Sequence, residues 1–156
     1  MTTMKSLELR VPPLLVLLLA GLLMGLIAVA TPPLAWSPTL RWGGAAAAIL
    51  PGAITALVGV FTFRRARTTV SPLRPEAASS LVINGIYRYT RNPMYLGMLL
   101  VLIGWAVFLA RPWALSVLPA FVVYMNRFQI APEERALRQI FGAEFDAYRK
   151  RVRSWL

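Results

Sequence analysis

Long stretches without charged residues alternate along the chain with short stretches that are rich in arginine. The uncharged stretches are residues 11–40, 42–63, 92–110 and 112–126. Because about 20 helical residues cross the ~30 Å hydrocarbon core of a bilayer, the first two are long enough to span it and the third is nearly so. The fourth is shorter, but Arg127 can extend it by reaching the membrane surface.

This pattern predicts an all-α, polytopic integral membrane protein with about four transmembrane helices. The predicted helices cover approximately residues 11–30, 42–63, 93–110 and 112–128. Only the Arg111-Pro112 pair separates the last two, so we expect them to form a tight helical hairpin. We interpret residues 1–156 as a single membrane-embedded domain with two polar segments, the loop 64–92 and the tail.

The first apolar stretch also has features of a secretory signal peptide. Lys5 and Arg10 precede an apolar core, and Ala28-Val29-Ala30 resembles a cleavage site. We favour a retained membrane span, and a cleaved signal peptide is the alternative.

Basic residues are concentrated in the loop and the tail. The loop 64–92 carries Arg64, Arg65, Arg67, Arg74, Arg88 and Arg91 against Glu76 alone. The other two connections carry only Arg41 and Arg111. Because cytoplasmic segments are enriched in Lys and Arg, this asymmetry places the N-terminus, the loop and the tail in the cytoplasm. We expect the bacterial inner membrane, with both termini cytoplasmic.

The composition agrees with a membrane protein and excludes several kinds of chemistry. Hydrophobic residues make up 58% of the chain and charged residues only 15%, whereas a soluble domain has roughly a quarter charged residues. There is no Cys and no His, which excludes thiol nucleophiles, imidazole bases and nearly every zinc or haem site, so we expect no metal. The net charge of +11 suits an anionic membrane surface, and the hydrophobicity argues against nucleic acid as the partner.

The tail has the pattern of an amphipathic, cytoplasmic helix over residues 132–153. Pro132 suits a first helical position, and Glu133 and Glu134 fall in the first turn, where the helix dipole favours anions. Apolar residues recur at steps of three and four, with Gly142 as a kink: Leu137, Phe141, Phe145, Tyr148, Val152 and Trp155. The basic residues around this stripe predict contact with anionic lipid headgroups. A docked helix without chemistry is the alternative for its second half.

Two arginines and two tyrosines lie between the turn at Asn84-Gly85 and the helix start at Asn92-Pro93, and a third tyrosine, Tyr95, follows shortly after it. An aromatic belt with flanking arginines is the structural interpretation of this segment. However, Gly85-x-Tyr87-x-x-x-Arg91-Asn92-Pro93-x-Tyr95 resembles the G-x-Y-x-x-x-R-H-P-x-Y motif of the isoprenylcysteine carboxyl methyltransferase family, parts of which related membrane phospholipid methyltransferases share. Asn92 stands where the family usually has His.

The tail extends the resemblance. Glu133-Glu134 followed by Phe141-Gly142-x-Glu144-Phe145-x-x-Tyr148 is similar to the family's E-E and F-G-x-E-Y-x-x-Y motifs, so the resemblance covers roughly residues 68–152. It implies a methyltransferase that uses S-adenosyl-L-methionine, with residues 64–92 as the catalytic loop. The cofactor-binding residues that it implies are Leu81, Val82, Tyr87, Asn92, Pro93, Tyr95, Glu133 and Glu134.

The acidic, aromatic and basic residues among the candidates can each bind part of the cofactor or of the substrate. Carboxylates at Glu133 and Glu134 can accept hydrogen bonds from the cofactor's ribose hydroxyls or amino group. The rings of Tyr87 and Tyr95 can lie near the sulfonium. Arg91 and Arg127 are candidate catalytic residues, because they should face each other across the hairpin and either can hold an anionic substrate group in a bidentate fork.

The acceptor follows less directly from the sequence. Methyl displacement mainly needs alignment and a water-poor site, and a carboxylate acceptor is already ionised at neutral pH and needs no base. We therefore expect a lipid-like or small apolar acceptor, most simply a carboxylate, with N- and S-methyl transfer left open. A non-catalytic lipid-binding or scaffold protein is one alternative. A small transporter subunit is another, although the predicted spans hold no acidic residue. The small residues 43–48 can support a homo-oligomer.

Overall fold

The computed structural model describes residues 8–65 and 80–156, and every regular element in these residues is a helix. The elements are α1 (Pro13–Ala30), α2 (Pro38–Arg65), η3 (Gly85–Arg88), α3 (Pro93–Leu109), η4 (Pro112–Ser116), α4 (Val117–Met125), η5 (Asn126–Ile130) and α5 (Ala131–Arg151). Of the short elements, η3 and η4 are 3₁₀-helices and η5 is a π-helix. The predicted all-α class is confirmed. Residues 66–79, which include Arg67, Arg74 and Glu76 of the predicted loop, lie outside the described residues.

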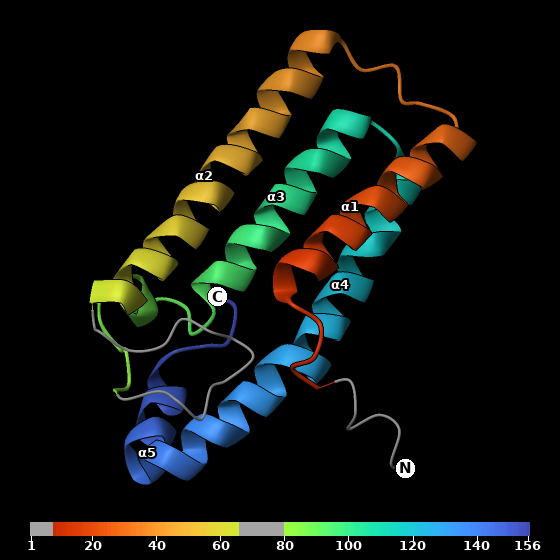
Figure 1. Ribbon diagram of the computed structural model, residues 1–156. Coiled ribbons are helices and arrows are strands. Elements are labelled where there is room, and N and C mark those ends of the chain that lie inside the picture. Colours follow the sequence, from red (N-terminus) through yellow and green to blue (C-terminus); the bar gives the residue numbers. More distant parts are fainter. Residues whose placement is uncertain (1–7, 66–79) are drawn as a thin grey trace.

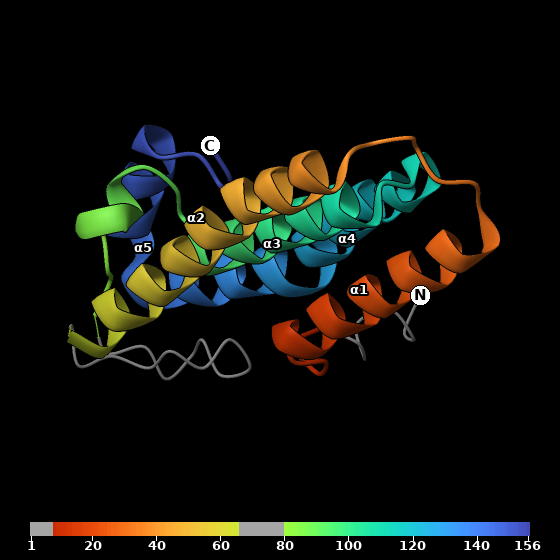
Figure 2. The same cartoon turned by 90° about the horizontal axis from the view of Figure 1, so that it is seen from above.

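Helices α1 to α4 lie side by side as an elongated bundle (Figures 1 and 2). Three helical stretches are long and apolar enough to cross a membrane: α1, α2 and the continuous run from η4 to α5. Helix α3 is also apolar but has only 17 residues. The prediction of a membrane protein is therefore confirmed, whereas four crossings and their orientation stay predictions.

Local chemistry fixes where α3 begins and ends. Pro93 occupies the first turn of α3, where its missing N–H costs nothing. Ala110 ends α3 in the left-handed region at φ 51°, and Pro112 follows within two residues. This break lets α4 return beside α3, as the predicted hairpin requires.

Helices α2 and α3 approach closely because glycines line their contact. A Cβ atom on Gly52 would lie 2.8 Å from the carbonyl oxygen of Gly97, and one on Gly104 would lie 2.8 Å from the carbonyl oxygen of Ala45. Small residues allow such backbone approach and gain van der Waals contact in a membrane. Part of the 43–48 face, which we expected to support an oligomer, is therefore occupied by α3 in the same chain.

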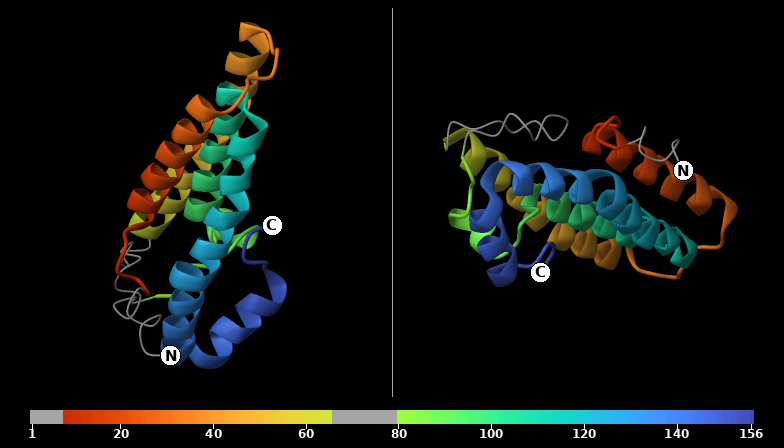
Figure 3. Two further views of the ribbon diagram at one scale, coloured as in Figure 1. Left: turned by 90° about the vertical axis from the view of Figure 1, so that its right-hand side faces the viewer. Right: turned by 90° about the horizontal axis from the view of Figure 1, so that it is seen from below.

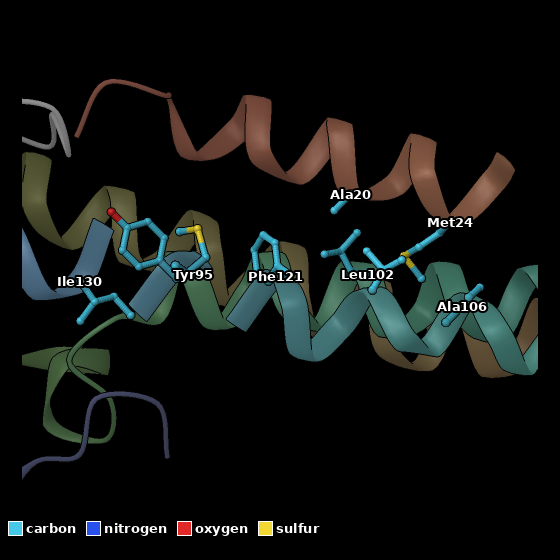
Figure 4. Close-up of a cluster of buried hydrophobic side chains, with 10 residues drawn as sticks. Ala20, Met24, Tyr95, Leu102, Ala106, Phe121 and Ile130 are labelled. Atoms are coloured by element: carbon cyan, nitrogen blue, oxygen red, sulfur yellow. The ribbon is translucent and has the colours of Figure 1, made fainter. Parts of the chain in front are cut away.

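The buried core lies between α1, α3 and α4, and it extends to the end of the bundle where α4 meets α5. Figure 4 shows Met24 of α1 near Leu102 and Ala106 of α3, with Phe121 further along. Tyr95 and Ile130 close the cluster at that end. The core thus places a phenol at the end of an otherwise apolar interior.

Helix α5 continues from α4 and then turns back toward the bundle (Figure 3). The turn occurs at Gly142, which has φ 49° and ψ −120°, so the predicted kink is confirmed. Beyond it Phe145 and Tyr148 of the predicted apolar stripe are almost completely buried. The chain end consequently lies beside the start of α3 (Figure 1).

Candidate active site

The two sequence motifs meet where the start of α3 faces the start of α5. Tyr95, in the first turn of α3, donates a hydrogen bond from its hydroxyl to a carboxylate oxygen of Glu133. Tyr95 is buried and Glu133 is partly buried. The Glu133 side chain therefore faces the bundle interior rather than the surface of α5.

The environment of Glu133 disfavours its negative charge. The pKa of the Glu133 carboxyl is raised to about 8, mainly by burial; the Tyr95 hydrogen bond lowers this pKa, and the nearby charge of Glu134 adds to the rise. The group is therefore largely protonated at neutral pH in the free protein. A cation bound nearby would favour its ionised form.

The adjacent carboxylate is held in a different way. Arg91 donates from Nη2 and Nε to one oxygen of Glu134, at 2.6 and 3.1 Å. Arg149 lies 3.5 Å from the other oxygen. The Arg91 and Glu134 side chains are only 11% and 19% exposed, so this pair is better shielded than a surface ion pair. Of two neighbouring acids, one therefore binds a phenol and the other an arginine.

Tyr87 contributes a buried hydroxyl to the same region. Its backbone oxygen accepts a 2.7 Å hydrogen bond from Tyr148, and its ring packs edge-on against Phe63 at 5.0 Å. Burial and the charges of Tyr148 and Glu133 raise the pKa of the Tyr87 hydroxyl, so it stays a neutral donor. Among the described residues this hydroxyl has no hydrogen-bond partner. A buried polar group is rarely left without a hydrogen-bond partner, so the Tyr87 hydroxyl is a candidate for contact with a ligand.

The remaining predicted cofactor residues lie just before and at the start of α3. Leu81 and Val82 precede η3, and Val82 is buried. Pro93 is fully buried as well. Asn92 donates from its amide nitrogen to two oxygens of Ser154, each at 2.9 Å. Its side chain is thus bound to the chain end.

Arg127 binds a different carboxylate from Arg91. It belongs to the π-helix η5 and donates to Glu8 at 2.6 Å, while Arg135 binds the second oxygen of Glu8. Within residues 8–65 and 80–156, Arg91 and Arg127 bind different carboxylates, and no hydrogen bond joins the two side chains. The expected face-to-face arrangement of the two arginines stays a prediction.

Sequence reasoning missed two groups of residues around the site. The chain end contributes Ser154 and the backbone oxygens of Val152 and Arg153, which bind the residues before α3. Gln129 is fully buried in η5 and donates to the backbone oxygen of Val11. Neither group belongs to a recognisable motif. The chain end binds mainly through its backbone oxygens, and Gln129 binds a backbone oxygen of another segment, so no side-chain pattern signalled either group.

Taken together, the site offers a protonatable carboxyl, two phenols and aromatic faces in a largely buried setting. Glu133 and Tyr87 can bind hydroxyl or amino groups, and the rings favour a cationic centre. Burial excludes water, which strengthens each electrostatic contact. Such a site suits a cationic small molecule with several hydrogen-bonding groups.

Comparison with protein families and curated proteins agrees with this chemistry. Residues 41–144 match the family model of phospholipid methyltransferases. The chain is 35% identical over 109 residues to protein-S-isoprenylcysteine O-methyltransferase B of Arabidopsis thaliana, which covers 68% of this chain and 54% of that protein. The Saccharomyces cerevisiae protein-S-isoprenylcysteine O-methyltransferase is 27% identical over 67% of this chain and 44% of its own length.

The chain thus spans about half the length of these two relatives. A further relative, an uncharacterised protein of Haemophilus influenzae, is 41% identical over 63 residues, which are 40% of this chain and the whole of that protein. No solved structure gives a significant match.

Proposed function

Because the chain belongs to the phospholipid methyltransferase family and is a membrane methyltransferase, we propose that it transfers a methyl group from S-adenosyl-L-methionine to a lipid-like or small apolar acceptor. The favoured acceptor group is a carboxylate. The observation that carries the proposal is the cluster of Glu133, Tyr95 and Tyr87 at the junction of the two motifs.

The residues of this cluster fit the cofactor. The buried Tyr87 hydroxyl lacks a partner among the described residues and can donate to the cofactor. Glu133 can accept from its hydroxyl or amino groups, and the cofactor's positive charge would favour the ionised carboxylate. When bound, S-adenosyl-L-methionine supplies an electrophilic methyl group on a sulfonium. Val82 and Pro93 exclude water from the surroundings.

The two arginines have separate roles in this proposal. Arg91 is bound to Glu134 and to the Val152 backbone oxygen, so it orders the acidic side of the site. Arg127 is 42% exposed despite its ion pair with Glu8. It is therefore the more accessible cation for an anionic group of the acceptor.

An apolar groove supports an acceptor with an apolar tail. The groove has a volume of about 470 Å³ and is lined by leucines of α1 together with Ile49 of α2 and Trp105 of α3. Its only polar side-chain group, the indole N–H of Trp105, is already bonded to the backbone oxygen of Gly21. The groove thus favours hydrocarbon over polar ligands.

We place the reaction at the cytoplasmic face of a bacterial inner membrane. Arg149, Lys150, Arg151 and Arg153 are exposed near the end of the chain and would contact anionic headgroups. Gly43 and Ala47 of the 43–48 face are exposed and available for a homo-oligomer.

Binding and transfer measurements on the protein in lipid nanodiscs test this proposal. We expect S-adenosyl-L-methionine to bind in calorimetry, and a labelled methyl group to move into lipid extract. Base-labile label would indicate a methyl ester and therefore a carboxylate acceptor. Absence of cofactor binding by a folded sample would overturn the proposal, and base-stable label would overturn the carboxylate acceptor alone.

A further inference from the structure

The chain end crosses the residues that precede α3. After α5 the backbone becomes extended at Val152, and the next two residues run alongside Thr90, Arg91 and Asn92. The Arg91 amide donates to the Arg153 backbone oxygen at 3.0 Å. The Thr90 hydroxyl donates to the Ser154 backbone oxygen at 3.2 Å. We call residues 152–155 the chain-end segment.

Asn92 is bound to this segment by two side-chain hydrogen bonds, whereas Thr90 and Arg91 each make one. Its amide nitrogen carries two hydrogens and donates to both the backbone oxygen and the hydroxyl of Ser154, at 2.9 Å each. The Asn92 backbone N–H binds the Thr90 hydroxyl. On the other side of Ser154, Trp155 donates to the side-chain oxygen of Asn126 at 2.8 Å. The chain-end segment is therefore fixed to both α3 and η5.

The same segment orients Arg91. One guanidinium nitrogen, Nη1, donates to the Val152 backbone oxygen, and the other two nitrogens bind Glu134. A guanidinium is planar, so fixing one nitrogen constrains the direction of the others. Arg91 thereby links the position of the chain-end segment to the position of the Glu134 carboxylate.

We propose that Asn92 and Ser154 form a latch that holds the chain-end segment across the start of α3, and that this latch positions Arg91 against Glu134. Asn92 and Ser154 are then positioning residues, which act on the site through Arg91. The consequence for cofactor binding rests on the proposed function. A neutral imidazole has one N–H donor, so His at position 92 could not donate to both Ser154 oxygens.

Hydrogen exchange at the Arg91 amide tests the latch without any activity measurement. This amide is bonded to Arg153, so its protection reports whether the chain-end segment stays in place. We expect exchange to be about tenfold faster in Asn92→Ala, which loses both side-chain hydrogen bonds. Ser154→Ala loses one and should show a smaller increase, whereas Ser154→Thr keeps the hydroxyl and should match the parent.

Ser116→Ala is the matched control, because Ser116 is exposed and its hydroxyl binds the nearby Trp113 oxygen at the other end of α4. Unchanged Arg91 exchange in both Asn92→Ala and Ser154→Ala would overturn the latch. If Asn92→Ala does not fold, the difference in Arg91 amide exchange between Ser154→Ala and Ser154→Thr is sufficient to test the latch.

Cofactor affinity then tests the second half of the proposal. In Asn92→Ala we expect the KM for S-adenosyl-L-methionine to rise several-fold with kcat largely kept, and Ser154→Thr to behave as the parent. Faster exchange with an unchanged KM would show that the latch does not order the acid pair, and would overturn that half. If the parent itself binds no cofactor, the proposed function fails, while the exchange result still decides whether the latch exists.

Discussion

Arg91, directly before Asn92 at the start of α3, binds Glu134 in the first turn of α5 through two guanidinium nitrogens at 2.6 and 3.1 Å. Four residues further on, Tyr95 binds the neighbouring acid, Glu133. Two parallel side-chain contacts thus join segments that are about forty residues apart in sequence. Arg91 compensates the negative charge of Glu134, whereas Glu133 is bound to a neutral phenol. A cation bound at this site would therefore act mainly on the ionisation of Glu133.

This pairing predicts the effect of replacing Arg91 with Lys. A lysine keeps the charge but cannot bind Glu134 and Val152 in a fork, because its ammonium is a single point. We expect Arg91→Lys to insert and fold normally but to lose methyl transfer by on the order of tenfold, which corresponds to about 1.4 kcal/mol. Rates and cofactor affinity in nanodiscs measure this effect.

Arg88→Lys, at an exposed position in η3, is the control and should behave as the parent. A slower rate with intact cofactor affinity would indicate that Arg91 acts on the acceptor. A loss of both would place it with the cofactor, as its contact with Glu134 implies. Full activity in Arg91→Lys would reduce it to a flanking charge and shift the acceptor role to Arg127.

Glu133 should contribute directly to cofactor binding. Glu133→Gln keeps the shape and a hydrogen-bonding oxygen for Tyr95 but removes the charge. We expect the dissociation constant of S-adenosyl-L-methionine to rise by the equivalent of about 1–3 kcal/mol, as for a lost charged hydrogen bond. Glu144→Gln, on the exposed face of α5, is the control. An unchanged constant in a folded Glu133→Gln variant would remove Glu133 from the cofactor site.

The pKa of Glu133 gives the same site a pH dependence. Burial raises this pKa to about 8, and binding of a cation favours the ionised group, so affinity should increase as the pH rises from about 6 to about 9. The ligand's own α-amino group titrates near about 8. Calorimetry on Glu133→Gln measures the pH dependence of affinity that comes from the ligand's α-amino group. The difference between this pH dependence and that of the parent is the contribution of Glu133. An identical pH profile in the two proteins would contradict this assignment.

The same titration affects stability in the opposite direction. Because the folded-state pKa lies above the ordinary value of 4.5, the protonated group stabilises the fold fully below about pH 4.5, and this contribution is lost as the pH rises through about 8. Without cofactor, the unfolding free energy of the parent should therefore fall more steeply over this range than that of Glu133→Gln.

Local chemistry explains which parts of the fold the sequence could predict. The start of α3 at Pro93, the break at Arg111-Pro112 and the kink at Gly142 each depend on the conformation of one or two residues. The choice of side-chain partners depends instead on how helices pack. The sequence thus indicated Arg91 as a site residue, but its partner Glu134 and the role of Ser154 required the three-dimensional arrangement.

Close packing of α2 on α3 predicts a local sensitivity to volume. A Cβ on Gly52 would lie 2.8 Å from both the Gly97 oxygen and the Leu100 Cβ, so Gly52→Ala must push the helices apart. We expect a loss of about 1–3 kcal/mol in unfolding free energy. Gly25→Ala is the control, because a Cβ there meets nothing within 4 Å and alanine favours the helix. Equal stability of the two variants would contradict the close contact.

The membrane orientation is a prediction that reporter fusions can test. Glu8, near the N-terminus, binds Arg127 in η5, directly after α4, and the chain end lies by the start of α3, so both ends of the described chain lie at the same end of the bundle as the site (Figure 1). The concentration of Arg and Lys in the loop and tail predicts that this end lies in the cytoplasm. Reporters fused after Arg74 and after Leu156 should both give cytoplasmic signals, whereas one inserted after Pro33, between α1 and α2, should give a periplasmic signal. A periplasmic signal from either of the first two fusions would reverse the orientation and remove the cofactor site from the compartment that supplies S-adenosyl-L-methionine.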